Sequence, residues 1–136
     1  MKETNIIALD IGRRRIGVAL ANSLNGFPSP LMTLENNENF IRSLEELIEK
    51  ESVSEIVVGL PISLSGNETE QTKYTRQLSE KIAKSTELPV HFQDEAMTSK
   101  KAEQELIKSK KSRQYGIDAL AATYILEDYL ARRRAA

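Results

Sequence analysis

The segment LDIGRRRIGVA, residues 9–19, places an aspartate at the end of one apolar run and three arginines before the next. The two runs, Ile6–Leu9 and Ile16–Leu20, predict two strands joined as a hairpin. Gly12 and Gly17 suit a tight connection and a close backbone approach, because neither carries a Cβ atom. The segment therefore predicts an antiparallel strand pair with a carboxylate near its turn.

The rest of the chain alternates short apolar runs with amphipathic segments. A third strand is expected near Leu31–Leu34, and the asparagines before Phe40 offer N-caps for a helix. Apolar residues at helical spacing then predict two helices, one through Phe40, Leu44, Leu47 and Ile48 and one through Tyr74, Leu78 and Ile82. The remaining expected elements are strands at Glu55–Pro61 and Val90–Gln93, a helix capped by Thr98, and a final helix at Ile117–Tyr129.

This order, β-β-β-α-β-α-β-α-α, predicts an α/β fold with a mixed five-stranded sheet flanked by helices. Glu55–Pro61 is nearly all apolar and rich in β-branched residues, so it should lie centrally, buried on both faces. The length of 136 residues is typical of one domain, which we expect to span residues 1–136.

The composition excludes several classes of protein. There is no cysteine, which excludes disulfides and thiolate metal sites, and no apolar run approaches the roughly 18 residues of a membrane span. Asp10 interrupts the position where a signal peptide would remain apolar, so we expect a cytoplasmic protein. The net charge of −1 means that any binding of nucleic acid must depend on local basic segments.

Three acidic residues stand at positions that favour chemistry. Asp10 lies inside an apolar strand, Glu95 follows another strand, and Asp118 falls in the first turn of the last helix. The carboxyl ends of strands in α/β sheets face a common crevice, and carboxylates held together there would repel one another unless they shared a cation. We expect one or two Mg²⁺ or Mn²⁺ ions and phosphodiester hydrolysis.

Structural roles are open for each of these residues singly. Asp118 is also typical of a helix cap or a partner of the helix dipole, and Asp94 with Glu95 is typical of a solvated turn. The single histidine, His91, is better explained by packing than by general-base chemistry.

The basic residues fall in three segments. Arg14 and Arg15 follow Asp10 and are candidates to bind a substrate phosphate, although a solvated hairpin turn explains them equally well. Lys110, Lys111 and Arg113 are candidates to clamp a nucleic-acid backbone, with a mobile surface loop as the alternative. Arg132–Arg134 are expected to form a frayed tail.

The residues also carry a family resemblance. Residues 9–19 resemble the opening signature of the YqgF family of Holliday junction resolvases and pre-16S rRNA nucleases. The resemblance continues through Val57–Pro61 with Gly66, through Asp94-Glu95 with Thr98 and Ser99, and through Ile117-Asp118 with Ala121, Ala122, Ile125 and Leu126. Ala96 and Ala21-Asn22 depart from it, because the family usually has arginine and Ser-Asp at these positions.

The resemblance implies an RNase H-like fold and a divalent-metal nuclease with Asp10, Glu95 and Asp118 as its acids. Asp94, next to Glu95, is an alternate metal ligand. It implies a role in maturing the 5′ end of pre-16S rRNA or, alternatively, in resolving branched DNA. Two other classes stay open, namely a non-catalytic nucleic-acid-binding module and a phosphotransferase of the actin-like type, which would need a second domain. The sequence leaves a monomer and a homodimer equally open.

Overall fold

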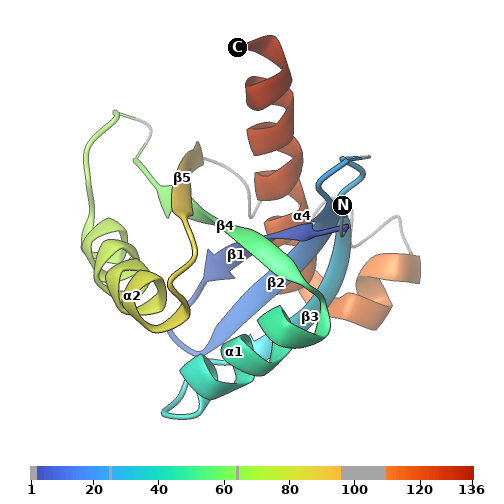
Figure 1. Ribbon diagram of the computed structural model, residues 1–136. Helices are drawn as coiled ribbons and strands as arrows, with labels where there is room; N and C mark the ends of the chain where they lie inside the picture. Colours follow the sequence, from blue (N-terminus) through green and yellow to red (C-terminus); the bar gives the residue numbers. More distant parts are fainter. Residues whose placement is uncertain (1–2, 25, 64, 96–109) are drawn as a thin grey trace.

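The computed structural model describes residues 3–24, 26–63, 65–95 and 110–136, with only the backbone of residues 110–115. Its elements are β1 (Asn5–Ile11), β2 (Arg15–Asn22), β3 (Ser29–Glu35), α1 (Phe40–Lys50), β4 (Val53–Pro61), α2 (Glu70–Thr86), β5 (Val90–Glu95) and α4 (Lys110–Ala135) (Figure 1). The expected helix after Thr98 lies outside the described residues. None of the helices in the described ranges is long and apolar enough to cross a membrane.

The five strands form one mixed sheet in the order β3-β2-β1-β4-β5. β1 pairs antiparallel with β2, and β2 pairs antiparallel with β3. β4 pairs parallel with β1 on one side and with β5 on the other. The predicted α/β fold, its hairpin and the interior position of the Glu55–Pro61 strand are therefore confirmed.

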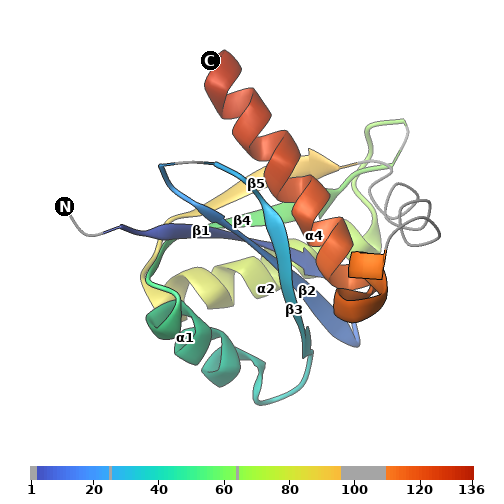
Figure 2. The same ribbon diagram turned by 90° about the vertical axis from the view of Figure 1, so that its right-hand side faces the viewer.

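The two faces of the sheet carry separate apolar cores, because successive strand residues point to opposite faces. On one face Ile7 and Leu9 of β1 pack with α1 and α2. On the other face Ile6 and Ala8 pack with α4, which runs across the sheet (Figure 2). β4 contributes to both cores, so it is buried on both sides as its sequence predicts.

The face under α4 is built from small side chains. Ala8, Ala19 and Ala21 are buried there, and two glycines, Gly17 and Gly59, lie beneath the helix. A Cβ atom on Gly59 would lie 2.3 Å from the Cδ1 atom of Ile125, so the absence of a side chain lets α4 approach the sheet closely.

Several expected boundaries differ in the structure. α4 begins at Lys110, and Gly116, with φ 84° and ψ 166°, separates two helical parts, the second of which starts at Ile117 as the sequence predicts. The alternative of a surface loop is therefore wrong for residues 110–113, whose backbone is helical. The expected frayed tail is also wrong, because the helix continues to Ala135 and its arginines contact the sheet.

The asparagines before α1 differ from the prediction as well. Asn39 is the N-cap residue, but its side chain makes no capping hydrogen bond. The side chain of Asn37 accepts a hydrogen bond from the backbone N–H of Asn39 at 2.9 Å, which is a local turn. The side chain of Asn36 instead contacts the hairpin between β1 and β2.

Candidate active site

Asp10 lies near the carboxyl end of β1, on the face of the sheet that α4 covers. It follows Ile6 and Ala8 in the strand alternation, and both of those residues belong to the core beneath α4. Its antiparallel partner on β2 is Gly17. The partly buried carboxylate therefore stands beside a strand position that has no side chain.

Gly17 is also the position at which Asp118 reaches the sheet. A Cβ atom on Gly17 would lie 1.9 Å from the main-chain carbonyl oxygen of Asp118, closer than any real contact. Only glycine allows the start of the second part of α4 to rest on β2 at this point. Because Gly17 pairs with Asp10, this packing brings the two aspartates together.

The two carboxylates interact electrostatically. Burial is the larger cause and the negative charge of Asp118 the smaller one, and together they raise the pKa of Asp10 from 3.8 to about 6. An ionised carboxylate at this place is therefore unfavourable unless a positive group approaches it. The pair has the electrostatic character of a cation site.

Arg15 supplies one positive group at the pair. Its Nε–H donates a hydrogen bond of 2.9 Å to Oδ2 of Asp118, and the arginine side chain is 62% exposed. Arg15 shares the α4 face with Gly17 because the two are separated by two strand positions. Arg14, the other predicted phosphate-binding residue of this segment, is exposed in the turn.

The hairpin turn is held on its other side by polar side chains that the sequence alone did not single out for this role. The Nε2–H of Gln71 donates to the carbonyl of Ile11 at 2.9 Å, and Asn36 Nδ2–H donates to the carbonyl of Gly12 at 2.8 Å. The guanidinium of Arg13 lies 4.4 Å from the ring centre of Tyr74. These contacts fix the turn that follows Asp10, and only their convergence in space reveals them.

Glu95 and Asp94 point to opposite faces of the sheet. Glu95 pairs with Pro61 and, by alternation, shares the α4 face with Asp10, whereas Asp94 is exposed on the other face, where its charge acts on Arg76. Among the described residues, no three acidic or histidine side chains lie close enough to hold one ion. The structure thus brings Asp10 and Asp118 together and leaves Glu95 at the same edge, beyond the intervening β4.

The other predicted residues lie elsewhere. The side chains of Lys110, Lys111 and Arg113 are outside the described part of the structure. His91 is at the opposite end of the sheet, where Nε2 lies 2.8 Å from Oε2 of Glu55 and the ring stacks on Tyr129. Arg133 also pairs with Glu55, at 3.2 Å. This cluster anchors the end of α4 and takes no part in the site.

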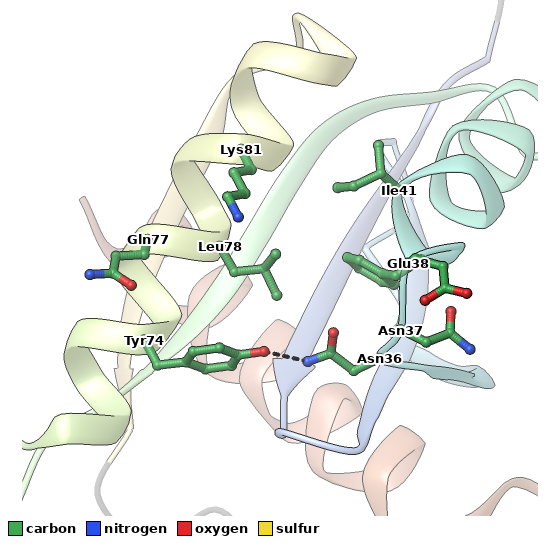
Figure 3. A pocket seen from close by; sticks show the side chains of 9 residues that line it. Asn36, Asn37, Glu38, Ile41, Tyr74, Gln77, Leu78 and Lys81 are labelled. Atoms are coloured by element: carbon green, nitrogen blue, oxygen red, sulfur yellow. Dashed lines mark hydrogen bonds between the residues drawn. The ribbon is translucent and has the colours of Figure 1, made fainter.

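A cavity of about 350 Å³ lies on the far face, between the start of α1 and α2 (Figure 3). Its lining includes Phe40, Leu78 and Lys81, together with Tyr74, whose hydroxyl accepts a hydrogen bond of 2.7 Å from Asn36. The cavity therefore adjoins the residues that support the hairpin turn, but it does not contain the acidic pair.

Known proteins resemble this chain in sequence and in fold. A protein of Rickettsia conorii named "Putative pre-16S rRNA nuclease" is 41% identical over 131 residues, which are 92% of this chain and 84% of its own. A Sulfurihydrogenibium protein of the same name is 37% identical over 132 residues, which are 95% of this chain and 91% of its own.

A structure entitled "T. thermophilus RuvC in complex with Holliday junction substrate" has a TM-score of 0.58 at 13% identity and covers 96% of both chains. A second RuvC structure from Thermus thermophilus gives 0.56 at 13% identity, over 96% of this chain and 97% of that one. These likenesses show the RNase H-like fold. The model of the RuvX family, described as Holliday junction resolvase, matches residues 4–132, and the chain therefore belongs to that family.

Proposed function

We propose that this protein is a divalent-metal nuclease that hydrolyses phosphodiester bonds, with one RNase H-like domain over residues 1–136. The observation that carries the proposal is the pair of Asp10 and Asp118, set side by side at the carboxyl edge of the sheet with Arg15 next to them. Two acids and an exposed arginine can attract a cation and a phosphate to the same place.

The residues present suit a hard divalent cation. The donors are carboxylate oxygens, which Mg²⁺ and Mn²⁺ prefer, and the repulsion between Asp10 and Asp118 is the conflict that a cation relieves. The amide oxygen of Gln93, opposite Gly59 on the same face, is buried and has no hydrogen-bond partner among the described residues. Asp10 and Asp118 would hold the ion, with Glu95 as the third acid. A bound ion would activate water and stabilise the leaving oxygen.

Other residues of the chain position Asp10 or bind the substrate. Asp10 is held rigidly because its strand is central and its turn is fastened by Gln71 and Asn36. Arg14 and Arg15 are exposed at the edge and can bind a substrate phosphate through paired N–H groups. Lys110, Lys111 and Arg113, in the first part of α4, complete the proposed substrate-binding set.

We propose a ribosomal RNA precursor as the substrate, with 5′-end maturation of pre-16S rRNA as the reaction and the cytoplasm as the location. The names of the relatives from Rickettsia and Sulfurihydrogenibium support this choice. The second candidate is branched DNA, because the family description is Holliday junction resolvase. A junction with two-fold symmetry would require a homodimer, whereas cleavage at one RNA end requires only a monomer.

The decisive experiment offers the purified protein a pre-16S rRNA fragment and a synthetic four-way DNA junction, each with Mg²⁺ or Mn²⁺. We expect cleavage of the RNA near its 5′ end and a loss of at least about 100-fold in Asp10→Asn and in Asp118→Asn. Glu55→Gln, far from the acids, is the matched control and should cleave like the wild type. Cleavage of the junction alone would favour the second candidate, and cleavage of neither would refute the nuclease proposal.

A further inference from the structure

The side chain of Arg15 contacts the acidic pair through one hydrogen bond, to Asp118. Its Nε–H donates to Oδ2 of Asp118, while within the described part of the chain its terminal N–H groups have no partner. The arginine side chain is 62% exposed and that of Asp118 is 26% exposed. Arg15 can therefore swing away at low cost, because an exposed arginine loses little on leaving a single carboxylate.

Asp118, in contrast, cannot withdraw its backbone. Its carbonyl rests on Gly17, and Ala119, which follows it, is fully buried. The backbone of Asp118 thus stays against Gly17 whichever cation the carboxylate faces, and only the side chain can turn. A divalent ion placed between the two aspartates would meet the guanidinium of Arg15 at the same carboxylate, and two positive groups there repel each other.

We propose that Arg15 is a positioning residue that holds the Asp118 carboxylate before an ion arrives and competes with the divalent cation for it. This inference rests on the proposed function, since it concerns the ion that Asp10 and Asp118 would share. Arg15 keeps the acidic pair partly neutralised until a cation displaces it. The displaced guanidinium is then the one that can bind a substrate phosphate.

The three consecutive arginines provide matched comparisons. Arg13 lies over the ring of Tyr74, and Arg14 is exposed in the turn, so only Arg15 contacts the acidic pair. Arg14→Gln removes the same charge from the neighbouring position without removing a contact to Asp118. Any difference between Arg14→Gln and Arg15→Gln then reports the direct contact and not the general loss of positive charge.

The test measures Mn²⁺ binding by calorimetry, without nucleic acid, in the wild type and both arginine variants, with circular dichroism as a check of folding. We expect Arg15→Gln to bind Mn²⁺ about fivefold more tightly than the wild type. The variant lacks the guanidinium that competes with the ion for Asp118, and a fivefold change corresponds to the free energy of one exposed salt bridge. Arg14→Gln should change the affinity by less than about twofold. In an Asp118→Asn background, Arg15→Gln should have no further effect.

A second readout follows the Arg15 Nε–H signal by NMR during a titration with Mg²⁺. The signal should move as the hydrogen bond to Asp118 is lost, whereas the Nε–H signal of Arg13 should not. Equal or weaker Mn²⁺ binding by Arg15→Gln than by Arg14→Gln, or an unmoved Arg15 signal at saturating Mg²⁺, would overturn the competition while leaving the metal site intact. Failure of the wild type to bind either ion would refute the metal site and this inference together.

Discussion

Asp10 lies in a central strand, where burial and the nearby Asp118 disfavour the ionised form of its carboxylate. Its pKa of about 6 lies above its ordinary value of 3.8, so the folded protein binds a proton there more tightly than the unfolded chain. Stability in the absence of metal must then fall as the pH rises from about 4 to about 6. The cost of ionising Asp10 is fully present above that range.

We predict that Asp10→Asn, measured in EDTA, has a higher free energy of unfolding than the wild type at pH 7. The gain should be about 3 kcal/mol, because the pKa of Asp10 rises from 3.8 to about 6 and each pKa unit corresponds to about 1.4 kcal/mol. Urea unfolding of both proteins between pH 4 and pH 7 measures it. The advantage should vanish near pH 4, and a difference that is constant with pH would show that Asp10 does not carry this cost.

The sequence indicates Asp10 by itself, since an acid inside an apolar strand is costly without a role. It does not decide between Glu95 and Asp94, because one residue of register determines which of them shares the face of Asp10. The pairing of Glu95 with Pro61 puts Glu95, and not Asp94, on the face of Asp10. The ion pair of Arg15 with Asp118 joins residues 103 positions apart, and no local pattern encodes it.

At the scale of elements, the contact between β2 and α4 depends on glycine. We predict that Gly17→Ala lowers the free energy of unfolding by about 3 kcal/mol, because the new methyl group would collide with the rigid backbone of Asp118. It should also reduce cleavage, since the acidic pair must separate. Gly59→Ala is the comparison, because its new methyl group meets the side chain of Ile125, at Cδ1 and Cγ1, and a side chain can shift more easily than the backbone of Asp118. Equal losses in the two variants, by thermal and urea unfolding, would contradict this account.

The far end of α4 provides a second prediction. Glu55, whose side chain is 13% exposed, contacts His91, the hydroxyl of Tyr129 and Arg133. We expect Glu55→Gln to lower the free energy of unfolding by about 1 kcal/mol, the usual value of hydrogen bonds to a charged partner that stays partly solvated. Metal binding, measured by calorimetry, should be unchanged, and a large loss of Mn²⁺ affinity would mean that this cluster positions Asp118.

The predicted strands and the predicted helices that correspond to α1 and α2 agree with the structure, because local periodicity determines them. Phe40, Leu44 and Leu47 of α1 are buried, as their spacing predicts. The second part of α4 starts at Ile117 as predicted, whereas the helical backbone of residues 110–115, which Gly116 separates from it, was not predicted. The course of Arg132–Arg134 was misjudged because contacts with Glu55 and Phe92, distant in sequence, keep these residues helical.

For the whole molecule, the sheet divides the chain into two layers with different roles. α1 and α2 cover one face with large apolar side chains and brace the hairpin turn, while α4 covers the other face and delivers Asp118. The described residues therefore couple folding to the proposed ion, since a cation that joins Asp10 to Asp118 also joins β1 to α4. The ion should stabilise the native state as a ligand does.

We predict that Mn²⁺ at about 100 times its dissociation constant raises the free energy of unfolding of the wild type by about 3 kcal/mol. Thermal unfolding with and without the ion measures the shift in the melting temperature. Asp118→Asn should lose most of this shift, whereas Asp94→Asn, on the other face, should keep it. A full shift of the melting temperature in Asp118→Asn would show that the ion binds somewhere other than at the acidic pair.

The packing of Asp118 on Gly17 also has a consequence during synthesis of the chain. Arg15 and Asp118 are 103 residues apart, and ribosomes add about 5–20 residues per second, so the second half of the site is made roughly 5–20 s after the first. During that interval Asp10 has no partner on α4. The proposed nuclease site therefore stays incomplete while the nascent chain is next to the ribosome's own RNA. It is completed only when α4 has been translated and has docked on β2.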